Sequence, residues 1–351
     1  MKKVISLILA LTISFGLVAC GGSGTASPAP SSGNNEPATS GPTYKMKLSH
    51  SMALTSGYHA FSENFKKLVE EGSNGDIQIE IYPASQLGGE RESLEAVQLG
   101  TLEFAIAGVA PTANFAPGLE VFSLPFLFES RDQAYEYFGA EGDKVFTRLN
   151  GSGLLGLSWA NSDFFDLYTS SPVEKPEDIK GYTIRCMENT LYMTYLSSLG
   201  ANPVPMAFSE VPAALTNGTI DGAALGIVGS YDLSMFDGMY FCQGDINWGP
   251  SPFVMNEALY KSMPVEYQEL IMTSAKASEK FLKGWHEEQL SIRLQEMIDK
   301  GCTHIEIDRD AFAKVCVQPV YDKMIKDGLV DPADITVINS YRTTEPYYTV
   351  K

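Results

Sequence analysis

We predict an α/β fold in two lobes, because the chain alternates strand and helix patterns in two successive series. In the first series, residues 44–50 alternate as a strand does, and residues 57–71 place apolar side chains at helical spacing. Residues 77–82 then alternate strictly and end at Pro83, which stops a strand. Strand, helix and strand in this order form the opening unit of a parallel sheet. After the N-terminal segment about 300 residues remain, enough for two domains of ordinary size.

The remaining elements continue the same alternation. A helix that ends at Gly100 and a short apolar strand complete the first series, whereas three apolar strands and a capped helix before Gly218 make the second. The expected ranges are 90–99 and 209–217 for the helices, and 104–108, 153–159, 183–186 and 222–225 for the strands.

The longest helical pattern covers residues 257–300, where apolar side chains recur at roughly helical spacing. Beyond Pro264 and Gly284 it holds few residues that disfavour a helix. We therefore expect one long helix in this part of the chain.

The N-terminus predicts export of the protein as a lipoprotein. Two lysines precede an apolar run at residues 4–18, which is too short and wrongly flanked for a stable membrane-spanning helix. The run ends in Leu17-Val18-Ala19-Cys20, a pattern that bacterial lipoprotein processing uses. We expect residues 1–19 to be a removed signal peptide and Cys20 to carry the lipid. The alternative is an ordinary signal peptide cleaved near Ala19, which would leave Cys20 free.

A flexible tether is expected at residues 20–43, which are rich in Gly, Ser, Pro, Thr and Ala and lack aromatic side chains. Such a tract cannot bury enough apolar area to offset its chain entropy. No later segment is long and apolar enough to span a bilayer. The expected location is therefore the periplasm or the outer face of the cytoplasmic membrane, with attachment through the lipid alone.

The charge of the chain limits its partners. The net charge is −18, and binding to nucleic acid requires clustered Lys and Arg, so we expect no nucleic-acid partner. An anionic ligand would need a local positive site, because the overall field repels it.

Besides Cys20 there are four cysteines, and an exported location permits disulfides between them. Four cysteines allow two bridges in three connectivities. No pair has Cys-x-x-Cys spacing, which disfavours a zinc or redox motif, and we expect no metal or cofactor. Cys186 follows Arg185 on a probable strand and is expected to pack as a small apolar residue. The four are Cys186, Cys242, Cys302 and Cys316.

One cation, Arg185, stands at the end of the short apolar strand pattern of residues 183–186. A guanidinium is always charged, and its planar fork of donors fits a carboxylate at two points, which a lysine cannot imitate. The residue therefore suggests capture of an organic acid.

The segment around Arg185 resembles a known family. Its motifs are those of the solute receptors of TRAP-type (tripartite ATP-independent periplasmic) transporters, in the DctP-like family. The similarity is long and ungapped here and extends over roughly residues 44–340. The matching stretches are Lys180-Gly181-Tyr-Thr-Ile184-Arg185, Leu199-Gly200-Ala-Asn-Pro-Val-Pro-Met-Ala-Phe208-Ser-Glu-Val211, Asp221-Gly222, Ile81 to Arg91, Ala96 to Gly100 and Leu124 to Phe128.

The resemblance implies a two-lobed fold like that of periplasmic binding proteins, with a hinge, a cleft between the lobes and a long bridging helix. It also implies a receptor that passes its ligand to the integral-membrane subunits of a transporter that uses no nucleotide. The chain would cross between lobes more than once, with hinges near residues 158–163 and 248–252. The expected divisions are 44–162 with 251–290 for lobe I, 163–250 with 291–340 for lobe II, and 341–351 for a C-terminal tail.

Site residues follow from the resemblance and from departures from it. Arg185 matches the carboxylate-binding arginine of the family, Phe208 an aromatic of the pocket, and Asn161 a polar residue near the hinge. At three positions this chain has an apolar residue or glycine where relatives have a polar one. Phe164 takes the place of a second arginine, Leu225 that of an asparagine, and Gly108 that of a glutamate found in acidic-sugar receptors. Polar groups of a ligand left unpaired in such a site would be costly to bury. We therefore expect an apolar pocket.

Further candidates for the pocket are Trp159, Met187, Trp248 and the strand-end His50. One charged anchor in an apolar pocket suits a monocarboxylate with an aliphatic or aromatic body, which is the favoured ligand. A large apolar residue is more often simply core, so these assignments have a plain alternative.

Other functions remain open at this point. The ligand could be a small dicarboxylate or a sugar acid, and the protein could be an exported enzyme or a surface adhesin. We expect no enzyme, because the chain lacks a Gly-x-Ser-x-Gly elbow, a phosphate-binding loop and a dinucleotide fingerprint.

Overall fold

The computed structural model describes residues 43–350, except for the side chains of Asn161 and Ser162. The predicted signal peptide, Cys20 and nearly all of the tether lie outside these residues. Within them, no helix has the length and apolar character needed to cross a bilayer.

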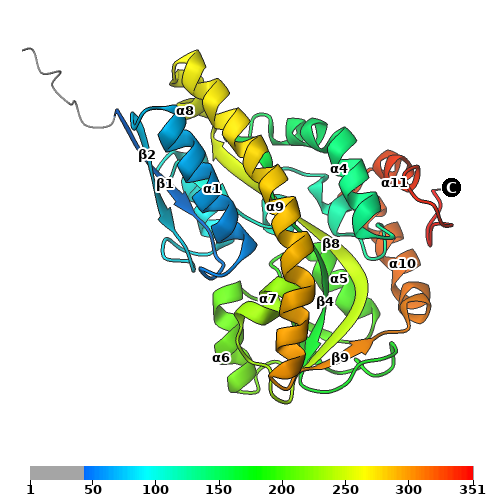
Figure 1. Ribbon diagram of the computed structural model, residues 1–351. Coiled ribbons are helices and arrows are strands. Elements are labelled where there is room, and N and C mark those ends of the chain that lie inside the picture. Colours follow the sequence, from blue (N-terminus) through cyan, green and yellow to red (C-terminus); the bar gives the residue numbers. More distant parts are fainter. Residues whose placement is uncertain (1–42, 351) are drawn as a thin grey trace, which may run out of the picture. The chain divides into compact units, whose positions relative to one another are not determined.

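The described residues form one mixed sheet of nine strands, with the order β2-β1-β3-β8-β4-β7-β5-β6 and with β9 paired to β8 (Figure 1). The strands are β1 (Tyr44–Ser49), β2 (Ile77–Tyr82), β3 (Phe104–Ile106), β4 (Leu154–Thr169), β5 (Thr183–Cys186), β6 (Asn202–Pro205), β7 (Gly222–Leu225), β8 (Tyr240–Asn256) and β9 (Thr303–Glu306).

Two parallel groups lie at the ends of this sheet and an antiparallel pair lies between them. In the first group β1 pairs in parallel with β2 and β3, and in the second β5 pairs in parallel with β6 and β7. The long strands β4 and β8 pair with each other in antiparallel register, and join the groups through β7 and β3. The sequence pattern predicted the parallel units but not the antiparallel pair.

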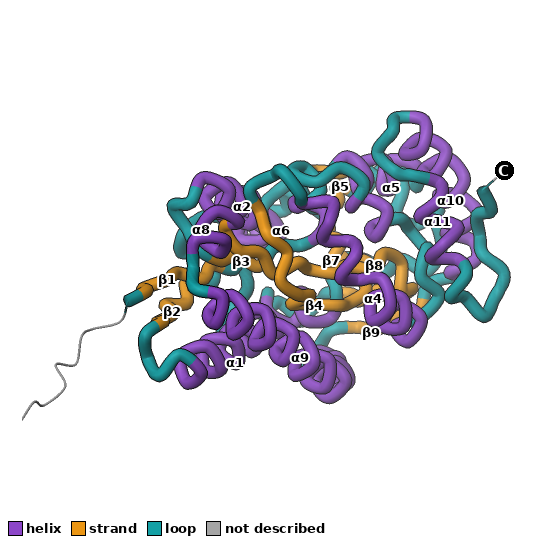
Figure 2. The backbone as a smooth tube through the Cα atoms, turned by 90° about the horizontal axis from the view of Figure 1, so that it is seen from above, coloured by secondary structure: helices purple, strands orange, loops and turns teal. Residues whose placement is uncertain are grey.

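The helices cover both faces of the sheet. Figure 2 shows α1 and α9 side by side on one face, with α2 and α5 on the other. The helices are α1 (Gly57–Gly72), α2 (Glu90–Leu99), α3 (Val109–Thr112), α4 (Arg131–Val145), α5 (Thr190–Ser198), α6 (Val211–Thr216), α7 (Ile227–Asp232), α8 (Glu257–Ser262), α9 (Val265–Asp299), α10 (Arg309–Lys326) and α11 (Pro332–Asn339), with 3-10 turns at Leu119–Ser123, Phe146–Leu149 and Phe208–Glu210.

The predicted long helix is two helices, because the chain breaks at Met263 and Pro264. Pro264 has no N–H to donate and disfavours a helical conformation in the residue before it, and Met263 is extended with ψ 155°. Helix α9 still has 35 residues and contacts α1, β4 and α7. It therefore reaches both parallel strand groups.

Two other elements differ from the prediction. The strand expected at residues 153–159 continues to Thr169, because β7 and β8 flank it and supply backbone partners even where Asp163 and Asp166 interrupt the apolar pattern. The helix expected at residues 209–217 is a 3-10 turn followed by the six-residue α6.

The core holds aromatic clusters and the four cysteines as free thiols. Phe65 packs edge-on against Phe253 and Phe104, at centroid distances of 4.7 and 5.4 Å, between α1 and the strands of the first group. The four cysteines of the described residues are buried and unpaired, so neither of the two permitted disulfides is formed. Cys186 lies in the apolar core, as expected for a small packing residue.

Candidate ligand-binding pocket

A pocket lies where the two parallel strand groups approach each other, and residues of both groups line it. The first group contributes the segment after β1 and the region around the start of α2. The second contributes the ends of β5 and β7, the turn after β6 and the start of α7. The lining residues are Ser51, Met52, Ser56, Gly57, Tyr58, Ser85, Gly89, Glu90, Arg91, Glu92, Gly108, Pro111, Asp163, Phe165, Arg185, Met187, Glu188, Met206, Ala207, Phe208, Leu225, Gly226, Val228 and Gly229.

Arg185 lines this pocket from β5 and is only 4% exposed. Its Nε donates to the backbone carbonyl of Met206 at 2.9 Å, which fixes the plane of the guanidinium. Within residues 43–350, neither terminal nitrogen of Arg185 makes a hydrogen bond or an ion pair. Burial lowers the pKa of Arg185, while nearby Cys186 and Glu90 act to raise it. The side chain therefore offers an oriented fork of donors inside the pocket.

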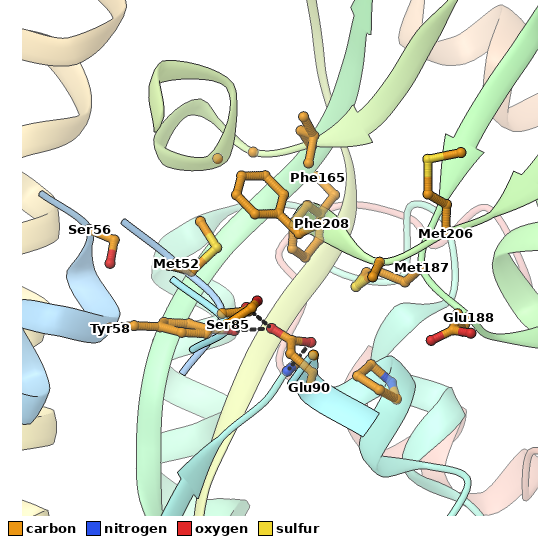
Figure 3. A pocket seen from close by; sticks show the side chains of 18 of the residues that line it. Met52, Ser56, Tyr58, Ser85, Glu90, Phe165, Met187, Glu188, Met206 and Phe208 are labelled. Atoms are coloured by element: carbon orange, nitrogen blue, oxygen red, sulfur yellow. Dashed lines mark hydrogen bonds between the residues drawn. The ribbon is translucent and has the colours of Figure 1, made fainter. Parts of the chain in front are cut away.

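Glu90, at the start of α2, places a carboxylate in the same pocket. Its Oε1 accepts from the hydroxyls of Ser51 at 2.9 Å and Tyr58 at 3.4 Å, and its Oε2 accepts from the backbone N–H of Gly108 at 3.0 Å (Figure 3). Burial raises the pKa of Glu90, whereas these hydrogen bonds and the charge of Arg185 oppose the rise. The protein itself thus supplies donors to both oxygens of this carboxylate.

A second carboxylate, Asp163, reaches the pocket from β4. Its Oδ1 accepts from Arg131 at 2.9 Å and from the N–H of Phe164 at 2.9 Å. Burial raises the pKa of Asp163, while Arg131 is the main opposing influence. Glu90 and Asp163 thus place two carboxyl groups in the pocket, of which Asp163 forms an ion pair with Arg131.

Apolar side chains make up much of the remaining lining. Figure 3 shows Phe165 and Phe208 between Met52 and Met187, with Glu90 below the two rings in this view. Methionine side chains adapt to ligands of irregular shape, and aromatic rings offer large apolar contact surfaces. Of the residues expected from the sequence, the structure brings Arg185, Phe208, Met187, Leu225 and Gly108 together in this lining.

Four other expected residues lie outside the lining. Trp159 stacks on Phe146 at 4.6 Å, and His50 is buried with its Nε2 3.3 Å from the Nδ1 of His59. Burial, followed by the charge of His59, lowers the pKa of His50 to about 3. Of Asn161 only the backbone is described, and it pairs with Ser251 of β8.

Phe164 and Trp248 are, with Trp159 and His50, the four expected residues outside the lining, and they form a core pair instead of a pocket wall. Their rings meet edge-on at 5.0 Å, and the guanidinium of Arg131 lies 5.6 Å from the ring of Trp248. Phe165, one residue along β4, lines the pocket. Side chains of neighbouring residues in a strand point to opposite faces of the sheet. The aromatic side chain that lines the pocket is therefore Phe165, one position after the Phe164 expected from the sequence.

Sequence reasoning missed Glu90, Asp163, Met52 and Tyr58. Glu90 lies within the matched stretch Ile81 to Arg91 and follows two glycines at a helix start, a signal that could have marked it. Asp163 and Tyr58 had no such signal, because their positions depend on strand pairing and helix packing.

The bacterial extracellular solute-binding protein family 7 model, DctP, matches residues 48–327. The chain belongs to this family. It is therefore a solute-binding receptor of the TRAP type and not an enzyme. The two-lobed α/β fold inferred from the resemblance is confirmed by solved receptors of this kind.

Relatives of this family 7 receptor support the same class. A solute-binding protein of Verminephrobacter eiseniae is 32% identical over 280 residues, covering 78% of this chain and 83% of the relative. A TRAP receptor of Bordetella bronchispeptica, with density assigned to pantoate, is 28% identical with a TM-score of 0.81 and matches 86% of this chain and 100% of that chain. A receptor of Sulfitobacter sp. NAS-14.1 with bound β-D-galacturonate is 26% identical with a TM-score of 0.80, over the same shares of the two chains.

Proposed function

We propose that this receptor captures an organic monocarboxylate with an apolar body and delivers it to the membrane subunits of a TRAP transporter. The observation that carries the proposal is Arg185, which is buried in the pocket, oriented by Met206, and has both terminal nitrogens free of hydrogen bonds with the described protein residues. A carboxylate that meets these two nitrogens would satisfy donors that are otherwise poorly solvated.

The rest of the lining favours one carboxylate and an apolar body. The methionine and phenylalanine side chains suit aliphatic or aromatic groups, whereas the carboxylate of Glu90 would repel a second carboxylate. Pantoate, assigned in the Bordetella receptor, is a branched hydroxy acid that combines these features. It is the ligand class that we favour.

A sugar acid is the second candidate, because Glu90 and Ser56 could accept hydrogen bonds from ligand hydroxyls. The galacturonate bound by the Sulfitobacter receptor is of this class. A small dicarboxylate fits less well, for the electrostatic reason given above.

Capture would involve closure of the two strand groups about the acid. The register shifts of β4 against β8 fall between Gly156 and Ser158, Trp159 and Asn161, and Phe165 and Leu167. Two of them lie within or beside the hinge expected at residues 158–163, and bulges of this kind let a strand bend. A ligand that contacts both groups shifts the equilibrium toward closure only by its higher affinity for the closed form. The lipid on Cys20 would keep the receptor beside its transporter.

A binding screen tests the proposal. The full-length mature protein, unfolded and refolded to remove any co-purified molecule, would be titrated calorimetrically with pantoate, D-galacturonate and succinate. We expect the tightest binding with pantoate. Preferential binding of succinate would overturn the favoured ligand class, and the lack of binding to any acid of a wider panel would overturn the receptor's ligand chemistry as a whole.

A further inference from the structure

A buried cation on α9, Arg293, connects two segments that belong to different strand groups. Its Nη2 donates to the backbone carbonyl of Thr55 at 2.5 Å, in the segment between β1 and α1. Its Nη1 lies 3.4 Å from Oδ1 of Asp232, the last residue of α7. The hydroxyl of Thr55 donates to the same Oδ1 at 3.0 Å, so the three residues form a closed triangle.

The charged pair of the triangle, Arg293 and Asp232, is shielded from water, whereas Thr55 is exposed. Arg293 is 6% exposed, and its guanidinium lies between the rings of Tyr231 and Trp285, at 4.7 and 4.9 Å from their centroids. The side chain of Asp232 is fully buried. Charged interactions are strong where water is excluded, and removal of one partner leaves the other charge buried and unpaired.

Both segments joined by Arg293 also line the ligand pocket. Thr55 lies between Met52 and Ser56, and α7 carries Val228 and Gly229. The triangle itself lies outside the lining, so it can act on a ligand only through the positions of these two segments.

We propose that Arg293, with Thr55 and Asp232, is a positioning residue that holds the two pocket segments together and thereby sets the affinity for the acid. The proposal rests on the function proposed above. Loss of the triangle moves the equilibrium toward separated segments, so part of the binding free energy of the acid must then be used to bring them together.

Distances across the pocket test this proposal directly. Nitroxide labels would be placed at two exposed positions, Glu71 of α1 and Asn217 after α6, in the full-length mature chain. Cys20 would be replaced by Ser, and the four cysteines of the described residues are buried, so engineered cysteines at these sites would be labelled selectively. Pulsed electron resonance would then give the populations of short and long distances, without ligand and with pantoate.

Two variants and one control define the result. Arg293→Met should lower the ratio of short to long distances by about tenfold, and Thr55→Val, which removes only one hydroxyl contact at an exposed residue, by about threefold. Lys300→Met is the matched control, because Lys300 also lies over the ring of Tyr231, at 5.1 Å, but pairs with Glu296 and not with Thr55. It should leave the ratio unchanged.

Unchanged distances in the variants, at unchanged melting temperatures, would overturn the role of the triangle. Should Arg293→Met fail to fold, Thr55→Val decides the question alone. If pantoate and the other acids leave the distances of the wild type unaltered, the proposed ligand chemistry is wrong. The comparison of the wild type with the variants in the absence of ligand still tests the role of the triangle.

Discussion

The Nε of Arg185 donates to the backbone carbonyl of Met206 at 2.9 Å, across the edge where β5 and β6 end. This bond uses one of the five N–H donors of the guanidinium. Because the guanidinium is planar, the bond also fixes the directions of the N–H groups on the two terminal nitrogens. A backbone group thus orients the guanidinium that we propose as the site for the ligand's carboxylate.

Arg185→Lys should weaken binding of pantoate by about tenfold to a hundredfold, although the charge is kept. An ammonium can replace neither the two-point contact with a carboxylate nor the bond to Met206 with the same geometry. Calorimetric titration measures the change. Arg91→Lys is the control, because Arg91 also lines the pocket but is half exposed and pairs with Glu95. Equal effects of the two substitutions would contradict the anchor role of Arg185.

Glu90→Gln should improve binding of succinate relative to pantoate by about tenfold, because the amide keeps the shape and removes the negative charge. One amide oxygen can still accept from Gly108. Competition between the two acids measures the selectivity. Glu92→Gln, at an exposed residue of the same lining, provides the comparison. A ratio of affinities that stays constant in Glu90→Gln would show that Glu90 does not repel dicarboxylates.

Phe65→Ala should lower the free energy of unfolding by about 3–5 kcal/mol, because it opens a cavity among Phe104, Phe253 and the residues around them. Denaturant unfolding measures the loss. Phe281→Ala, at a residue 43% exposed on α9, should cost much less. Comparable losses at both sites would argue against the packing described for the first strand group.

His286 should make the protein less stable as the pH falls from 7 to 5. The residue is buried on α9, and burial, followed by Arg131 and Arg293, lowers its pKa to about 3. Between the unfolded pKa near 6.5 and this value, the unfolded state binds a proton that the folded state does not, so acidification favours unfolding.

The variant His286→Gln should remove this contribution. The loss of stability between pH 7 and 5 should then be smaller than in the wild type by up to about 2 kcal/mol. Unfolding by urea at the two pH values gives the difference. His304→Gln serves as the control, since His304 is half-buried and hydrogen-bonded to Gln243. The prediction fails if His286→Gln retains the full pH dependence.

The short local elements, and the presence of Arg185 at a ligand-sized pocket, could be predicted from the sequence. Residues 77–82 and 90–99 follow their patterns because alternation and helical spacing depend on neighbours in the chain. Arg185 was identified because an arginine in an apolar strand is itself unusual, and the resemblance gave it a role.

The tertiary structure alone decided which other residues share the pocket with that arginine. The pairing of β4 with β8 turns Phe165 toward the pocket and Phe164 into the core, and a change of one residue in register would exchange them. Likewise Glu90 and Asp163 are 73 residues apart in the chain and meet at one site only because the two strand groups share a sheet. Such contacts depend on packing between distant segments, which the local pattern of side chains does not encode.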